Sequence, residues 1–197
     1  MTSEQELVQK FRNGLFLASS RTYAEQYVEP LIRAKYNLLE PTSDDHDALG
    51  RNGIRFEIKA SKVLHPTGNG KKTKTLFDRI MFESDQDTVD RVVGFDERLN
   101  ADFLANIQNV KRDHFEELIY VLLFSDSIKI FIAKAKDIRK GAFPNWSDKH
   151  GRYDAPGKSG QFPINKSNIE WHLEHHLNDS IDYAEAAGIA KRISITK

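Results

Sequence analysis

The chain has 197 residues, of which 39% are hydrophobic and 29% charged, a composition typical of a folded globular domain. It contains no cysteine, which excludes a disulfide framework and a cysteine-based zinc site. The 29 basic residues balance the 29 acidic ones, so bulk charge does not indicate a nucleic-acid partner. No apolar run is long enough to cross a membrane and the polar N-terminus lacks a secretory signal, so we expect one cytoplasmic domain over residues 1–197.

Two helices are predicted near the N-terminus. Ser3 and Glu6 have the spacing of a capping box, ahead of a helix that continues to residue 18. Thr22 and Glu25 repeat this spacing ahead of a second helix that reaches residue 39. Pro30 should kink or interrupt that second helix, because proline lacks the backbone N–H that a helix interior needs.

A turn-rich segment at 41–53 leads into a strand at 54–64. Residues 76–92 mix charged and apolar positions and predict no definite element. The alternation of helices and strands predicts an α/β fold with a mixed central β-sheet flanked by helices. The remaining elements expected in chain order are a loop at 64–75, a helix at 101–115, strands at 118–124 and 128–135, a basic and aromatic loop at about 139–161, a strand at 161–164, and helices at 166–177 and 180–190.

The predicted strand at 54–64 carries charged residues on one face. Glu57 and Lys59 project from the same face, roughly 7 Å apart, because a strand rises about 3.3 Å per residue. The segment Arg51-Asn52-Gly53 predicts a hairpin loop with Gly53 in the left-handed conformation. A three-residue loop centred on Asn52 would place Asp47 opposite Glu57, whereas a two-residue loop would place it opposite Phe56.

Two facing carboxylates repel each other unless a cation neutralises them. Mg²⁺ accepts one or two carboxylates and takes further ligands from water and phosphate. A neighbouring lysine can orient water and stabilise the charge on a phosphate under attack. This set of side chains is suited to phosphodiester hydrolysis. The alternatives are a solvated strand face with a cross-strand ion pair, and an Asp47 that merely flanks a turn.

The same residues resemble the catalytic motif of the PD-(D/E)xK nuclease superfamily, with Asp47 followed later by Glu57-Ile58-Lys59. The segments "RTYAEQYVEPLI", "DHFEELIYVLLFSDSIKIFIA" and "GKSGQFPINKSNIEWH" are similar to helices and strands of type II restriction endonucleases. The resemblance covers roughly residues 20–177, in pieces. The chain departs from the pattern in having His46, not proline, before the aspartate, and Asp44 and Asp45 are alternatives to Asp47.

The resemblance implies a restriction-endonuclease-like core and a Mg²⁺-dependent, site-specific endonuclease for double-stranded DNA that leaves 5′-phosphate and 3′-hydroxyl ends. Asp47, Glu57 and the Ile58 carbonyl would hold Mg²⁺, and Lys59 would position and activate the attacking water. Glu25 would support the site, or would serve only in its capping box. The resemblance also implies a homodimer on a palindromic site. A structure- or damage-specific repair nuclease, a junction resolvase and a non-catalytic DNA-binding module remain alternatives.

Basic and amide side chains outside this motif are candidates for DNA contacts. The lysines after the strand would bind phosphates, and polar residues of the long loop would reach base edges, unless they only keep loops solvated. These candidates are Lys62, Lys71, Lys72, Lys74, Lys140, Asn145, Lys149, Arg152, Lys158 and Gln161.

Three aromatic residues and three histidines can each be interpreted as structural or as functional. Phe143, Trp146 and Tyr153 could stack on bases, but we favour a role in anchoring the long loop. The three histidines at 172, 175 and 176 have a spacing that can bind zinc on a helix. They lack the HExxH arrangement, so we interpret them as an ordinary helix surface and core.

Overall fold

A computed structural model describes residues 2–66, 91–148 and 159–195. A five-stranded sheet has the order β1-β2-β4-β5-β7, and β3 pairs with β6 in a separate two-stranded sheet. β2 and β4 are parallel and every other neighbouring pair is antiparallel, which confirms a mixed sheet. The strands are β1 (Ala48–Leu49), β2 (Arg55–Lys62), β3 (Leu104–Val110), β4 (Glu117–Leu123), β5 (Ile128–Lys134), β6 (Gly160–Asn165) and β7 (Leu177–Ile181).

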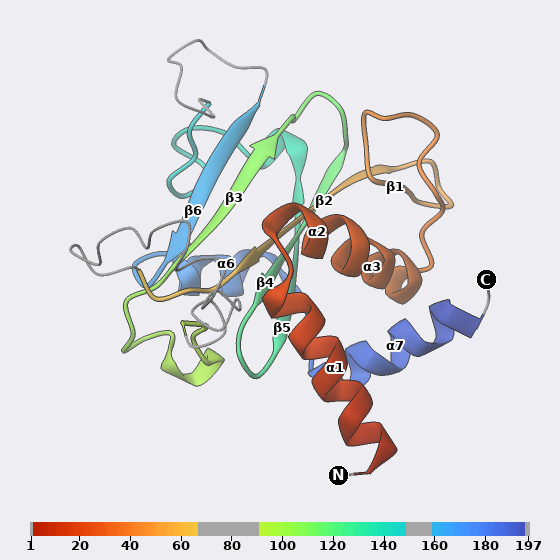
Figure 1. The fold of residues 1–197 in the computed structure, drawn as a ribbon. Coiled ribbons are helices and arrows are strands. Elements are labelled where there is room, and N and C mark those ends of the chain that lie inside the picture. Colours follow the sequence, from red (N-terminus) through yellow and green to blue (C-terminus); the bar gives the residue numbers. More distant parts are fainter. Residues whose placement is uncertain (1, 67–90, 149–158, 196–197) are drawn as a thin grey trace, which may run out of the picture.

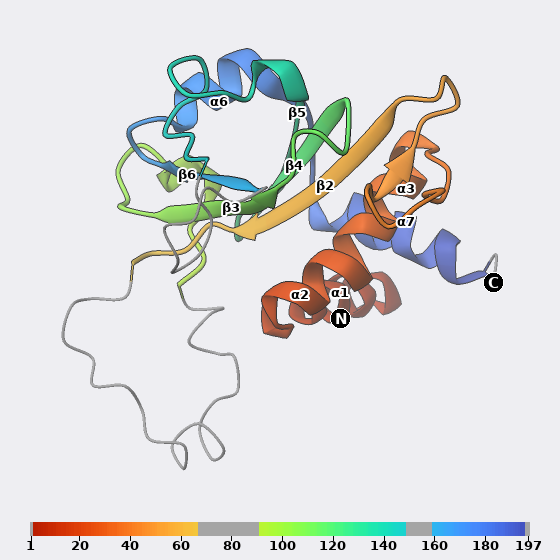
Figure 2. The same ribbon diagram turned by 90° about the horizontal axis from the view of Figure 1, so that it is seen from above.

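Helices cover both faces of the sheet, which confirms the predicted α/β architecture (Figure 1). Seen from above, α1, α2, α3 and α7 lie on one side of β2 and β4, and α6 lies on the other side with β3 and β6 (Figure 2). The helical segments are α1 (Ser3–Leu17), α2 (Ser20–Tyr23), the π-helical turn η1 (Ala24–Val28), α3 (Glu29–Tyr36), the 3₁₀ turns η2 (Phe95–Glu97) and η3 (Ala135–Asp137), α6 (Ile169–His176) and α7 (Tyr183–Ile195).

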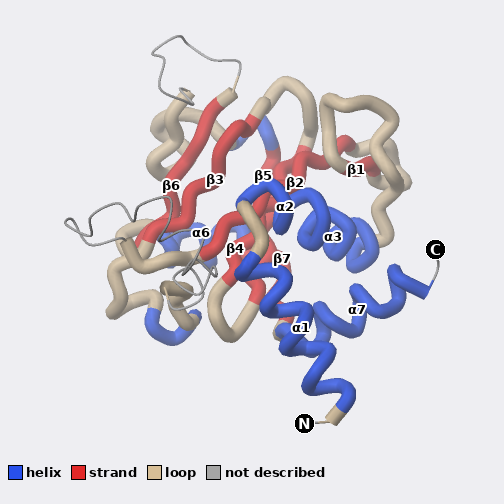
Figure 3. The backbone as a smooth tube through the Cα atoms, in the orientation of Figure 1, coloured by secondary structure: helices blue, strands red, loops and turns tan. Residues whose placement is uncertain are grey.

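The central strand β4 is buried on both faces, as its continuous apolar sequence predicts. Because successive side chains of a strand point to opposite faces, β4 contributes to two separate cores. Ile119 and Val121 pack in the core formed with α1, α3 and α7. Leu118 and Tyr120 pack in the core formed with β3, β6 and α6. Figure 3 shows the strands in red and the helices in blue, with β3 and β6 on the side away from α1 and α7.

The N-terminal helices begin at different residues from those predicted. The capping box of α1 is formed by Thr2 and Gln5, one position before the predicted pair. The helical segment containing Thr22 already starts at residue 20, and the Thr22 N–H lies 3.4 Å from the Ser19 hydroxyl. The predicted capping box of Thr22 with Glu25 is therefore wrong. The helix changes character just before Pro30, because the π-helical turn ends at Val28 and α3 begins at Glu29 with the proline in its first turn.

Two elements differ in type from the prediction. The segment predicted as a helix at 101–115 contains strand β3, in which buried Ala105 and Ile107 alternate with more exposed neighbours. The segment forms a strand and not a helix because β6 lies alongside and pairs with it. β7 was not predicted, because it is an edge strand with only Ile181 buried and so carries a weak apolar pattern.

The described part of the long loop packs against the molecule. Phe143 and Trp146 are buried in the core beside β6, so they anchor the loop, as favoured from the sequence. Tyr153 lies outside the described residues. The strand predicted at 161–164 is confirmed as β6, which begins one residue earlier, at Gly160.

Candidate active site

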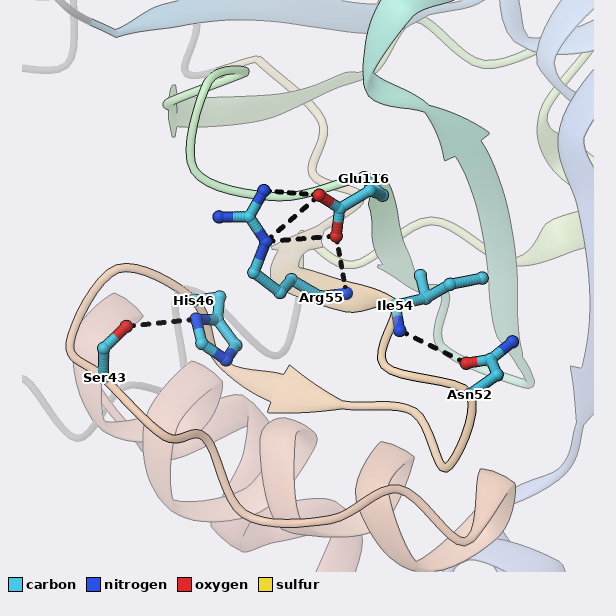
Figure 4. Close-up of polar contacts among 6 residues, drawn as sticks. All are labelled: Ser43, His46, Asn52, Ile54, Arg55 and Glu116. Atoms are coloured by element: carbon cyan, nitrogen blue, oxygen red, sulfur yellow. Dashed lines mark hydrogen bonds and ion pairs between the residues drawn. The ribbon is translucent and has the colours of Figure 1, made fainter.

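The hairpin of β1 and β2 has the register predicted for a loop centred on Asn52. Ala48 pairs with Phe56 and Leu49 with Arg55. Gly53 has a φ of 82°, in the left-handed region that the predicted turn requires. The other contacts of this hairpin include a hydrogen bond from Ile54 N–H to Asn52 Oδ1 at 3.2 Å (Figure 4).

Asp47 lies immediately before β1 and binds the edge of β2. Its N–H donates to Phe56 O at 2.9 Å, and its Oδ2 accepts from Ile58 N–H at 2.8 Å. The Asp47 carboxylate thus takes the place of the backbone carbonyl that a neighbouring strand would offer to Ile58 N–H. Since the N–H and C=O of one strand residue point to the same edge, the Ile58 carbonyl also faces the side where Asp47 lies.

The ammonium of Lys59 lies between two carboxylates. It is 2.5 Å from Glu57 Oε1 and 3.4 Å from Asp47 Oδ2. The side chain of Glu57 is 8% exposed, whereas those of Lys59 and Asp47 are 22% and 25% exposed. The structure therefore brings the three predicted catalytic residues together at a site that solvent can reach.

The charges at this site shift one another's pKa values. Burial raises the pKa of Glu57, and the charge of Asp47 adds to this, while the charge of Lys59 opposes it. Burial alone would lower the pKa of Lys59, but the charges of Glu57 and Asp47 outweigh it and the pKa is raised. Lys59 is consequently held as a cation by the two carboxylates.

Glu29 is a further acidic residue at this site, and the sequence prediction missed it. Burial and the charge of Asp47 raise the pKa of Glu29 to about 7. Arg33 connects the two residues, because one of its nitrogens is 4.0 Å from Glu29 Oε2 and donates to Asp47 O at 3.3 Å. The available signal was the spacing of four residues from Glu25, which places both acids near one another at the π-helical turn.

Glu25, the predicted supporting residue, has an exposed side chain. Its charge contributes to the raised pKa of Glu29, so the two carboxylates interact. Glu29 is the better buried of the two and senses both Asp47 and Lys59.

The neighbouring aspartates are placed differently from Asp47. Asp44 is exposed, and Asp45 Oδ1 lies 3.1 Å from His114 Nδ1. The buried His46 ring, which stands where the nuclease motif has proline, lies 3.3 Å from the Ser43 hydroxyl (Figure 4). Of these three aspartates, Asp47 is the one that contacts both Ile58 and Lys59.

An ion pair between Arg55 and Glu116 lies at the start of β2. Arg55 donates to both carboxylate oxygens of Glu116 from its side chain, and its N–H donates to Glu116 Oε2 at 2.8 Å (Figure 4). The Arg55 side chain lowers the pKa of Glu116 to about 2. This pair ties the start of β2 to the start of β4, which flanks the candidate site on the sheet.

Lys62 is not available for the phosphate contact predicted for it. Its side chain is buried, and its Nζ donates to Phe16 O at 2.8 Å and to Ala18 O at 2.9 Å. The ammonium also lies 4.6 Å from the centroid of the Tyr23 ring. Lys62 satisfies carbonyl groups at the C-terminal end of α1, because it lies on the face of β2 opposite Lys59.

The other predicted DNA contacts are scattered. Lys140 and Asn145 are exposed and line a pocket with Trp171. The backbone of Gln161 pairs in both directions with Ser147, at 2.9 Å. The remaining candidates, Lys71, Lys72, Lys74, Lys149, Arg152 and Lys158, lie outside the described residues.

The histidines of α6 have separate partners. His172 is fully buried, its Nδ1 is 2.9 Å from the Tyr120 hydroxyl, and burial lowers its pKa to about 3. His175 and His176 lie beside the carbonyl groups of Trp171 and Ile132. No group of three histidine, cysteine or acidic side chains is arranged for a metal ion in the described part of the chain. His172 belongs to the core and His175 to the exposed surface of α6, the positions favoured from the sequence.

The donor set beside Lys59 fits a hard divalent cation. Asp47 and Glu57 provide carboxylates, and Ile58 provides a carbonyl on the same strand edge. Mg²⁺ in proteins takes one or two carboxylates and keeps several waters, so these oxygens are sufficient. The Lys59 ammonium between the two carboxylates indicates that their arrangement attracts positive charge.

Comparison with known protein families finds no family pattern that matches this chain. Comparison with curated proteins likewise finds no significant match. In the three described ranges, no helix has the length and apolarity needed to cross a membrane. The function must therefore be argued from the chemistry of the site.

Proposed function

We propose that this protein is a Mg²⁺-dependent endonuclease that cuts double-stranded DNA at specific sequences, with a core related to that of type II restriction endonucleases. The observation that carries the proposal is the contact of Lys59 with both Glu57 and Asp47 at the edge of β2. Two acids can hold a metal ion that activates water, and an ammonium beside them can stabilise the charge on a phosphodiester under attack.

In this proposal Asp47, Glu57 and the Ile58 carbonyl hold Mg²⁺. When bound, Mg²⁺ would supply Lewis-acid stabilisation of the phosphate charge and a lower pKa for water. Lys59, kept protonated by its neighbours, orients the attacking water and stabilises charge on the phosphate. Glu29 is a further acidic group beside this site, because Arg33 lies 4.0 Å from its carboxylate and also donates to Asp47 O.

The reaction balances as hydrolysis. The water oxygen forms a bond to phosphorus while the bond from phosphorus to the 3′ oxygen breaks. The water gives up a proton and the departing 3′ oxygen gains one, which leaves a 5′-phosphate and a 3′-hydroxyl. Cutting both strands of a palindromic site would employ two copies of the chain, so we include a homodimer in the proposal.

The experiment is digestion of a long, unmodified DNA of known sequence by the purified protein. With Mg²⁺ we expect a fixed set of fragments that share one end sequence. With Ca²⁺, whose larger coordination sphere orients water poorly, we expect binding without cleavage. Cutting after exhaustive chelation would contradict the proposed metal dependence.

Two other outcomes would favour the alternatives. Cutting restricted to branched or damaged DNA would indicate a repair nuclease or a junction resolvase. Binding to DNA without cleavage in any divalent metal would indicate a non-catalytic binding module. The molecular mass from sedimentation, measured with and without a duplex that contains the cleavage site, tests the proposed dimer.

A further inference from the structure

The two-stranded sheet of β3 and β6 has one apolar face and one polar face. Figure 1 shows these strands side by side, away from α1 and α7. Ala105 and Ile107 of β3, with Phe162 and Ile164 of β6, are buried in the core. The alternate residues, which are exposed or half-buried, are Leu104, Asn106 and Gln108 of β3 and Gln161, Pro163 and Asn165 of β6.

A β-bulge concentrates amide side chains at one end of this sheet. Ile107 pairs with Phe162 and the next pair is Val110 with Gly160, so Gln108 and Asn109 lie opposite Gln161 alone. Asn109 has a φ of 57°, a left-handed conformation that asparagine adopts more readily than most residues. Gln108 and Asn109 are both exposed. We name Gln108, Asn109 and Gln161 the amide ribbon.

β3 runs alongside β2 in the opposite direction. Leu64 and Leu104 exchange backbone hydrogen bonds of 2.9 and 3.2 Å. Further along, Asn106 N–H donates to Ser61 Oγ at 3.0 Å. The Asn106 N–H thus points away from β6, where its partner Pro163 has no N–H to donate.

Beyond the bulge, the charge of Lys111 acts on Glu57. Residue numbers rise along β3 as they fall along β2, so Gln108 and Asn109 follow Asn106 on the side of β2 that leads to Lys59.

We propose that the amide ribbon enters the major groove of duplex DNA and reads adenine bases next to the cleaved phosphate, with Gln108 and Asn109 as specificity-determining residues. The proposal rests on DNA being the substrate. The major groove of B-form DNA admits a two-stranded β-ribbon, whereas the deep major groove of an RNA helix does not. Glutamine and asparagine pair in bidentate fashion with adenine N6 and N7. β3 contacts β2 at Ser61, two residues from Lys59, so a base held by the ribbon would lie near the phosphate that the proposed site attacks.

The test is selection of bound duplexes from a randomised DNA pool in Mg²⁺-free buffer containing Ca²⁺, which reads base preference without cleavage. The variants are Gln108→Ala and Asn109→Gly, since glycine keeps the left-handed backbone while removing the amide. Gln9→Ala removes an exposed amide from α1 and is the matched control.

We expect the wild-type protein and Gln9→Ala to select the same adenine-containing sequence. Each ribbon variant should lose discrimination at one base pair by roughly 5- to 150-fold, which corresponds to 1–3 kcal/mol for one bidentate contact. Binding to unselected DNA should change little, because phosphate contacts provide that affinity. Replacing the adenine by 7-deazaadenine should weaken wild-type binding and leave the matching variant unaffected.

Retention of full base preference by both ribbon variants would overturn the inference, as would a wild-type protein that selects no sequence. Preferential binding of RNA duplexes would overturn it as well. These outcomes are separate from the fate of the proposed chemistry. A protein that selects adenine-containing duplexes through Gln108 but never cuts them would retain the reading role while refuting the endonuclease.

Discussion

Asp47 Oδ2 accepts a hydrogen bond from Ile58 N–H at 2.8 Å, so a side chain occupies the place where a neighbouring strand would otherwise pair. β1 pairs with β2 at Phe56 and Arg55, and Asp47 lies directly beyond that short ladder. The carboxylate is therefore held at the edge of β2 by backbone geometry. This relationship, and the contacts of Lys59, define the variants that test the site.

Asp47→Asn should abolish cleavage while preserving the fold. The amide oxygen of asparagine can still accept from Ile58 N–H, but the negative charge needed for Mg²⁺ is gone. We expect activity to fall by more than ~100-fold, because even outer partners of a metal site change activity by ~10–100-fold. Cleavage rates of Asp44→Asn and Asp45→Asn serve as matched controls. Full activity in Asp47→Asn, with loss in either control, would transfer the ligand role to that neighbour.

Lys59→Met should reduce cleavage by about 10²–10⁴-fold, the range typical of a group that handles protons or charge in the transition state. The substitution also removes the cation between Glu57 and Asp47. Mg²⁺ no longer competes with an ammonium there, so it should raise the Tm of this variant more than that of the wild type. Lys134→Met, at the exposed end of β5, is the control. Near-normal cleavage by Lys59→Met would disprove the proposed site.

Glu29 should make the stability depend on pH. Its pKa is about 7 in the folded protein against 4.5 for an ordinary glutamate, so the folded state binds this proton more tightly. The resulting stabilisation is fully present below pH 4.5 and is lost as the pH rises through about 7. Glu29→Gln should flatten this decline in urea unfolding measured between pH 5 and 8. The exposed Glu174→Gln should not, and an unchanged slope in Glu29→Gln would contradict the assignment.

Lys62→Met should destabilise the fold without weakening DNA binding. The variant leaves the Phe16 and Ala18 carbonyls without their donor, which costs about 1–3 kcal/mol for buried groups. Unfolding in urea measures this loss. The dependence of DNA affinity on salt should keep the same slope, since a lost phosphate contact would reduce the slope by about 1. A reduced slope would restore Lys62 as a phosphate ligand.

Local sequence was sufficient for several parts of this molecule. The alternation from Ile54 to Lys59 predicts β2, and the Asn52-Gly53 turn predicts the register that brings Asp47 to β2. The apolar run in β4 predicts a strand buried on both faces. These features depend on residues close to one another in the chain, where turn geometry and side-chain alternation act directly.

Tertiary packing decided the rest. Strand alternation places Lys59 and Lys62 on opposite faces of β2, but it does not give their partners. Packing puts the Lys59 ammonium between two carboxylates and the Lys62 ammonium at the end of α1. Glu29 joins the site because a π-helical turn and α3 carry it to Asp47, and β3 is a strand because β6 lies beside it. The burial of a charge and the partner of a strand depend on segments far apart in the chain, so no local pattern specifies them.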